Sequence, residues 1–141
     1  MSDPALVFEI EIKSSPERIW QAITSPDWTR RYLFDTAVRS EWSRGGKVAW
    51  ENADGSAAAQ GEVLECEPPW RLVTTWTSLW SPDLAHEPPS RVTWEIEERA
   101  EKRCLLRVTH DRLERAPKTR TQVGSGWQRI IDGLRTAVEA A

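Results

Sequence analysis

Histidine is the residue type best suited to acid-base chemistry near neutral pH, and this 141-residue sequence contains two, His86 and His110. His110 ends the alternating stretch "KRCLLRVTHD" on the same side as Leu106 and Val108, so a strand here would point its ring inward. A buried imidazole either satisfies a polar group in the core or acts as a general acid or base beside a cavity. His110 is therefore a weak candidate for a catalytic residue.

Other catalytic patterns find little support. Asp111 follows His110 directly, and neighbours on a strand point to opposite faces, so the two cannot form a dyad. The carboxylate of Glu95 alternates with apolar neighbours and is expected on the solvent face. The chain has no H-x-x-x-H, G-x-S-x-G or C-x-x-C motif, and Cys66 and Cys104 lie far apart, as expected for two reduced thiols. We therefore expect no metal site and no cofactor, and favour a non-catalytic protein over an enzyme.

Tryptophan is unusually abundant, with nine Trp against one Tyr and two Phe. Trp50, Trp76 and Trp94 each occupy the apolar register of a predicted strand, while Trp28 and Tyr32 lie on a predicted short helix. So many large rings are hard to pack at interior density without voids, whereas rigid aromatic walls suit an apolar ligand with one or two polar groups. The aromatic content therefore predicts an internal pocket.

The closing stretch, residues 123–141, begins with Val-Gly-Ser-Gly and continues as an amphipathic helix. Its apolar stripe recurs at helical spacing and consists of Trp127, Ile130, Ile131, Leu134, Ala137 and Val138. Most of the stripe is expected to pack on a sheet, with Trp127 and Ile131 facing a space near the Gly-rich end. Ser125 is expected to cap the helix, and the absence of a Walker lysine argues against a phosphate-binding loop.

The rest of the pattern predicts the elements that position these residues. The stretch "LVFEIEIK" alternates as a half-buried strand, and two Ser-Pro start signals, in "SSPERIWQAIT" and "SPDWTRRYLF", predict two short helices. About six alternating strands joined by short turns follow between residues 38 and 111, which is typical of an antiparallel meander. With the closing helix, this order predicts one α+β domain over residues 1–141.

The longest irregular segment is "LWSPDLAHEPP", residues 79–89, which holds Trp80 and His86 between two predicted strands. Long loops in compact domains are often functional. We expect His86 to be solvated and the segment to act as a gate to the pocket.

Charge and hydropathy argue against two kinds of partner. The net charge is −3, and the 19 basic and 22 acidic residues are spread along the chain, unlike the concentrated basic face of a nucleic-acid binder. No apolar run is long enough to span a bilayer, and the first residues lack the order of a secretory signal. We therefore expect a cytoplasmic protein without a membrane span.

The order of elements resembles the START/Bet v 1-like (SRPBCC) superfamily and its helix-grip fold. The run "EPPWRLVTTW" and the Gly-Trp entry to the last helix resemble the family of the C-terminal domain of the Hsp90 ATPase activator, and the resemblance covers nearly the whole chain. Arg112 and Gln128 replace a Gly and a Pro that bacterial members often carry. The resemblance implies a curved antiparallel sheet of six to seven strands around a long C-terminal helix, with two short helices after the first strand and a cavity between sheet and helix.

Three functions are open, because relatives in this superfamily include lipid carriers, aromatase/cyclases and co-chaperone domains. The leading hypothesis is binding of a small hydrophobic or aromatic molecule. The expected lining residues are Trp28, Tyr32, Trp50, Trp76, Trp94, Trp127 and Ile131, with His110 as a polar contact. The alternatives are a polyketide cyclase or dehydratase-like enzyme that uses His110, and a module that contacts an Hsp90-type chaperone. The sequence leaves open whether the protein is a monomer or a homodimer.

Overall fold

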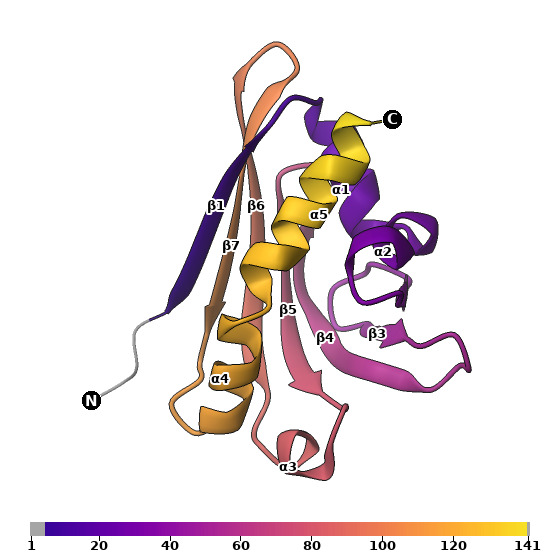
Figure 1. Cartoon of the computed structure of the whole chain (residues 1–141), viewed down its shortest axis with the longest axis vertical. Helices are drawn as coiled ribbons and strands as arrows, with labels where there is room; N and C mark the ends of the chain where they lie inside the picture. Colours follow the sequence, from indigo (N-terminus) through magenta and orange to yellow (C-terminus); the bar gives the residue numbers. More distant parts are fainter. Residues whose placement is uncertain (1–4, 141) are drawn as a thin grey trace.

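The computed structural model describes residues 5–140 and shows a curved antiparallel sheet with a long helix across its concave face (Figure 1). The strands are β1 (Leu6–Ile12), β2 (Ala37–Ser40), β3 (Lys47–Glu51), β4 (Ala57–Glu67), β5 (Arg71–Ser78), β6 (Ser90–Ala100) and β7 (Arg103–Asp111). The helices are α1 (Pro16–Thr24), α2 (Pro26–Tyr32), α3 (Pro82–Ala85), α4 (Pro117–Gly124) and α5 (Trp127–Glu139). The predicted helix-grip class is confirmed.

The seven strands form one sheet in the order β1-β7-β6-β5-β4-β3-β2. Strands β2 to β7 are neighbours in sequence and in space, while β1 returns to pair with β7, from Leu6 opposite His110 to Ile12 opposite Cys104. The predicted alternation in β7 is confirmed, since Cys104, Leu106, Val108 and His110 are all buried on the inner face. This register brings the end of β7 below the start of α5.

Helix α5 supplies the core of the molecule with its apolar stripe. Its buried residues are Trp127, Ile130, Ile131, Leu134 and Val138. Helix α2 packs against it at Gly133, where an added Cβ would lie only 3.0 Å from the Cβ of Tyr32. The glycine therefore allows a close approach of the two helices, which holds the loop after α2 near the start of α5.

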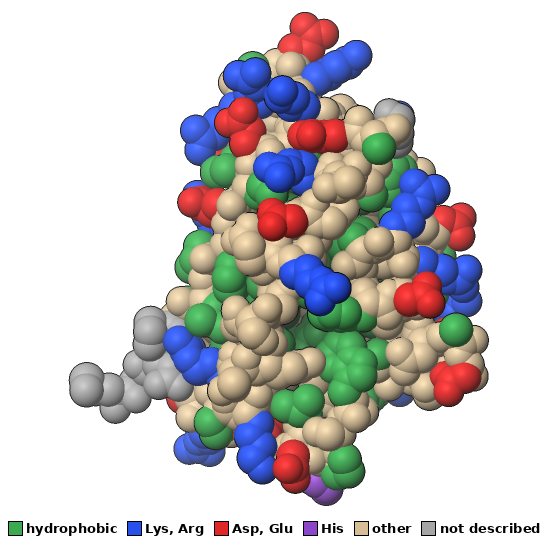
Figure 2. All heavy atoms as spheres, in the orientation of Figure 1, with side chains coloured by type: hydrophobic (Ala, Val, Ile, Leu, Met, Phe, Trp, Pro, Cys, Tyr) green, Lys and Arg blue, Asp and Glu red, His purple; other side chains and the backbone are tan. Residues whose placement is uncertain are grey.

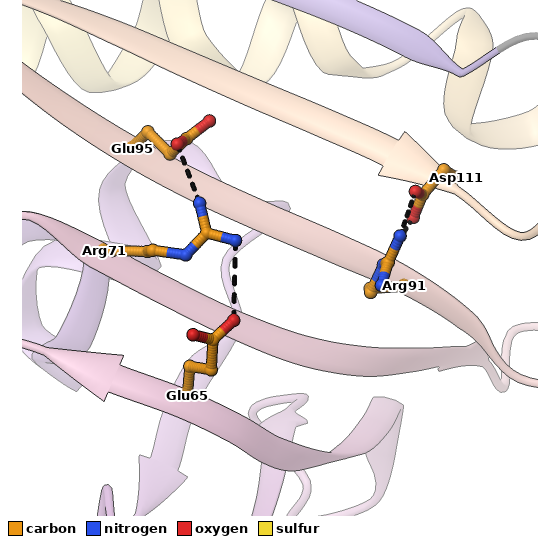
Figure 3. A network of polar contacts seen from close by, with 5 residues as sticks. All are labelled: Glu65, Arg71, Arg91, Glu95 and Asp111. Carbon is orange, nitrogen blue, oxygen red and sulfur yellow. Dashed lines mark hydrogen bonds and ion pairs between the residues drawn. The ribbon is translucent and has the colours of Figure 1, made fainter.

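The outer face of the sheet carries ion pairs (Figure 3). Arg71 on β5 lies 2.8 Å from Glu95 on β6 and 3.4 Å from Glu65 on β4, and Arg91 pairs with Asp111 on the next strand. Glu95 thus lies on the solvent side, as predicted. No helix among residues 5–140 has the length and apolar character needed to cross a membrane.

The structure departs from the predicted elements in three places. The loop at residues 79–89 contains the one-turn helix α3, and α4 precedes α5 where no helix was predicted. The prediction for Ser125 is wrong, because Gly126 occupies the N-cap of α5. Ser125 instead closes α4 with helical dihedral angles, which fold its hydroxyl back to donate to the carbonyl of Gln122 at 3.0 Å. The expectations for residues 1–4 and 141 lie outside the described residues.

Candidate functional site

A pocket of about 280 Å³ opens where α4 meets α5. The end of α2, the end of β5 with its following loop, and the break between the two helices all contribute to it. Its lining residues are Leu33, Phe34, Trp76, Trp80, Gln122, Val123, Ser125, Gly126, Trp127, Arg129 and Ile130. Figure 2 shows hydrophobic side chains gathered in a hollow on this face. The pocket lies at the Gly-rich end of the final helix, where the sequence predicts a space.

Two exposed aromatic rings stand at the mouth of the pocket. Phe34 and Trp80 retain 48% and 40% of their accessible surface, and their centroids lie 5.8 Å apart in an edge-to-face arrangement. Phe34 and Asp35 both have positive φ, 51° and 58°, a conformation that costs roughly 1 kcal/mol or more for residues other than glycine. The turn directs Phe34 toward Trp80 instead of into the core. The pair therefore forms an apolar rim from two separate loops.

The inner wall is made of two buried indoles, Trp76 and Trp127, whose centroids lie 6.1 Å apart. Trp50 packs behind Trp76 at 4.6 Å, and Trp94 packs behind Trp127 at 5.4 Å. These four rings fill the core by tilted and edge-to-face contacts, geometries that aromatic pairs prefer. Of these four rings, only Trp76 and Trp127 line the pocket.

His110 lies behind this wall and is fully buried. The indole N–H of Trp127 donates to Nδ1 of His110 at 3.0 Å, so this nitrogen carries no proton, and Nε2–H then donates to Oγ of Ser90 at 2.7 Å. The hydroxyl of Ser90 donates in turn to the carbonyl of Trp76 at 3.2 Å. Burial lowers the pKa of His110 to about 4, against a smaller opposing effect of Asp111, so the ring is neutral at neutral pH.

A second hydrogen-bonded chain links the wall to α4. The indole N–H of Trp76 donates to Oγ of Ser78 at 2.9 Å, and the hydroxyl of Ser78 donates to Oε1 of Gln122 at 2.8 Å. Ser78 is fully buried, and Oε1 of Gln122 is the acceptor of its proton among the described residues. The amide oxygen of Gln122 therefore faces Ser78, and its NH2 group has no acceptor among the described residues.

Helix α4 is held by a carboxylate from the loop before β6. Ala116 precedes α4 and has no side chain that can cap it. Glu87 supplies the cap, accepting from the backbone N–H groups of Lys118 at 3.0 Å and Thr119 at 2.7 Å and from the hydroxyl of Thr119 at 2.8 Å. Burial alone would raise the pKa of Glu87, but these hydrogen bonds outweigh it and the pKa lies below its usual value. The loop that carries Trp80 is thereby tied to α4.

The structure brings five of the predicted site residues into one cluster and leaves three apart. Trp50, Trp76, Trp94, His110 and Trp127 contact one another in sequence-distant pairs, and of these Trp76 and Trp127 line the pocket. Tyr32 is buried, and its hydroxyl donates to the carbonyl of Ala22 at 2.7 Å. Ile131 is buried, and the neighbouring Ile130 lines the pocket instead. Trp28 is half-buried on α2, beneath the guanidinium of Arg31 at 4.9 Å.

The lining residues that the sequence reasoning missed come mainly from the two loops and from α4. Trp80 lies in the segment at residues 79–89 that was predicted to act as a gate, and this place in the sequence was the signal that could have identified it as a lining residue. Gln122 lies on the helix that was not predicted. Arg129 was assigned to the outer side of the final helix, yet it lines the pocket, which also takes in residues of α4 and of the break before α5.

Within residues 5–140, no three potential metal ligands of the His, Cys, Asp or Glu type lie together. Arg129 is the only lining residue of the pocket with a formal charge. The arrangement thus offers an apolar cavity with an amide donor and one cation at its edge.

The comparisons with known proteins agree with this fold. Protein MLL2253 from Mesorhizobium loti has a TM-score of 0.77 at 21% identity, covering 98% of both chains. CalU16 from Micromonospora echinospora has a TM-score of 0.75 at 23% identity, covering 95% of this chain and 75% of its own. PFC0360w, an HSP90 activator from Plasmodium falciparum, has a TM-score of 0.73 at 21% identity, covering 94% of both chains. No curated protein sequence matched.

Fold and sheet order define a helix-grip protein of the Bet v 1-like (SRPBCC) kind. The sequence profile of the family described as "Activator of Hsp90 ATPase homolog 1-like protein" matches residues 13–139. The chain belongs to this family, as the resemblance in sequence implied.

Proposed function

We propose that the protein binds a small apolar or aromatic molecule in the pocket at the α4–α5 junction. The observation that carries the proposal is the pair Phe34 and Trp80, two exposed rings in contact over a cavity walled by Trp76 and Trp127. Exposed apolar surface beside a concave site is typical of ligand recognition. No other pair of large hydrophobic side chains with this exposure is in ring contact among the described residues.

The size of the pocket narrows the ligand. A volume of about 280 Å³ lies at the small end of the roughly 300–1,000 Å³ range of ligand sites. A ligand of one or two fused rings fits this volume, with Phe34 and Trp80 lying over it.

The lining favours binding over catalysis. An acid or base must lie within hydrogen-bond reach of the proton it transfers. His110, the catalytic candidate, has both ring nitrogens engaged and is separated from the pocket by Trp76 and Trp127. His110 serves better as a positioning residue for the indole of Trp127 than as a group that contacts a substrate.

The test is a substitution at Gly126 that places a larger side chain in the pocket. A Cβ on Gly126 would lie 3.6 Å from the carbonyl oxygen of Gln122 and 3.8 Å from the ring of Phe34, which are ordinary contact distances, so Gly126→Leu places a side chain at the mouth without a backbone clash. Gly124→Leu is the matched control, because a Cβ there meets only Leu6 at 3.7 Å and Gly124 does not line the pocket. Titration of 2-naphthamide, followed by the indole N–H signals in NMR, should shift Trp76 and Trp127 in the wild type and in Gly124→Leu but not in Gly126→Leu. Equal binding to all three proteins would rule this site out.

A second candidate function is contact with an Hsp90-type chaperone, favoured by the family match and by the likeness to the HSP90 activator PFC0360w. To test this candidate, we propose measuring the ATPase turnover of a bacterial Hsp90 with and without this protein. Unchanged ATPase turnover at saturating concentrations of this protein would remove this candidate and leave the pocket proposal intact.

A further inference from the structure

We propose that the ligand of this pocket carries an anionic group, most simply a carboxylate, which binds between Arg129 and the amide of Gln122 while the apolar body lies against Trp76 and Trp127. The inference rests on the proposed function and deepens it, because it names the chemical class of the ligand: a small aromatic or alicyclic acid.

The first support is the unpaired cation at the rim. Arg129 lines the pocket, and no carboxylate of the described chain forms an ion pair with it. Two acidic residues neighbour the lining residues in sequence, Asp35 and Asp132, and neither pairs with Arg129. Asp132 instead accepts from the side chain of Gln128 at 3.1 Å. An arginine fork beside an apolar cavity is suited to a planar carboxylate.

The second support is the orientation of Gln122. Its amide oxygen accepts from the fully buried hydroxyl of Ser78, which has no other acceptor for its proton among the described residues. The remaining NH2 group can only donate. A ligand oxygen that accepts a hydrogen bond therefore fits here, whereas a ligand donor would meet another donor.

A third feature of this edge is the start of α5. Gly126, Trp127, Arg129 and Ile130, from the N-cap and first turn of the helix, all line the pocket, and no side chain of the described residues caps this turn. The free N–H groups of a first turn carry the positive end of the helix dipole. This field has the same sign as Arg129 but is opposed by the C-terminal end of α4 at the same junction, so Arg129 and the amide donor are the groups that favour a negative group at this edge.

The experiment compares two ligands of nearly the same shape, 2-naphthoate and its neutral analogue 2-naphthamide, by calorimetric or NMR titration at low salt. The wild type should bind naphthoate about five- to tenfold more tightly, the range expected for a partly exposed charged hydrogen bond. The preference should shrink as salt is added, because exposed charges are screened.

Two variants test which residues cause the preference for naphthoate over naphthamide. Arg129→Gln and Gln122→Glu should each abolish the preference for naphthoate over naphthamide, measured as the ratio of the two affinities in each variant. Gln122→Glu still accepts from Ser78, so the fold is retained while the donor is lost. Arg135→Gln, which removes an exposed arginine of α5 that does not line the pocket, is the matched control and should behave as the wild type.

The outcomes separate this inference from the proposed function. Equal wild-type affinity for the two ligands, or a preference for naphthoate that survives in both Arg129→Gln and Gln122→Glu, overturns the anionic group and leaves the apolar pocket standing. Failure of both ligands to bind overturns the pocket and the inference together.

Discussion

Hydrogen bonds through His110 link β5, β6 and β7 to the start of α5. Whether each atom donates or accepts follows from its partner. Trp127 can only donate, so His110 must accept at Nδ1 and donate at Nε2, and Ser90 must pass its proton to the carbonyl of Trp76. A protonated imidazole would have no lone pair for Trp127. The neutral ring is thus a condition for holding this indole in the pocket wall.

The stability of the protein should depend on pH through His110. Its pKa is about 4 in the folded state, below the value of about 6.5 expected when unfolded. The unfolded chain takes up this proton first as the pH falls, so the free energy of unfolding should fall between about pH 6.5 and 4, by on the order of 3 kcal/mol. Urea denaturation at pH 7.5, 5.5 and 4 measures the change.

Two variants isolate the contribution of His110 to that slope. His110→Phe should be less stable at pH 7.5, because it leaves Trp127 and Ser90 without their partner, but should lose less stability on acidification. His86→Gln, which removes the exposed histidine, should keep the wild-type slope. The pKa of Asp111 is also lowered, chiefly by its hydrogen bond to Arg91, which all three proteins retain. A slope in His110→Phe equal to that of the wild type would contradict the assignment.

At the scale of elements, α4 is stabilised by a residue that is not part of the helix. Only Thr119 and Val123 are buried on it, and its cap comes from Glu87, which precedes Thr119 by 32 residues. Its one local start signal is Pro117 at the first position, without a capping side chain at Ala116, which explains why the helix was not predicted. The loop before β6 and α4 are joined, since Lys118 also lies 3.1 Å from Asp83.

Removal of this cap should loosen α4 selectively. Glu87→Ala should speed amide hydrogen exchange in residues 117–124 by roughly five- to tenfold, since loss of a helix cap costs about 1 kcal/mol. Exchange in β6 and β7 should not change. Glu101→Ala, in the exposed turn between those strands, is the control. If α4 exchanges at the same rate with and without Glu87, the carboxylate does not hold the helix.

The elements that carry their own signals could be predicted from the sequence. Ser15 caps α1 by accepting from the N–H of Arg18, and the strands from β5 to β7 follow their alternation. The candidate site was harder to predict, because it forms where α4 and two loops meet. Nothing in the local pattern around Phe34 or Arg129 indicates that these residues line the same pocket. The aromatic cluster could be predicted as a set, but the pattern could not separate Trp76, which reaches the pocket, from Trp50 behind it.

At the scale of the whole molecule, the two faces of the sheet differ in how much they stabilise the fold. Leu134 is fully buried between sheet and helices, so Leu134→Ala should lower the free energy of unfolding by about 2–5 kcal/mol. Arg71 and Glu95 each keep 36% of their side-chain surface exposed, so Arg71→Ala should cost less than about 1 kcal/mol despite two ion pairs. Urea denaturation of both variants checks the contrast. Similar losses would show that the outer ion pairs act as a network.

The break between α4 and α5 divides the C-terminal part of the chain into two kinds of residue. Beyond it, Ile131, Leu134 and Val138 are committed to the core. Around it, Phe34 and Trp80 keep nearly half of their surface exposed at the mouth of the pocket. Under the proposed function, the preference among ligands can therefore be changed at these two mouth positions, for instance in a library randomised at both, while the fully buried residues of α5 are left as they are.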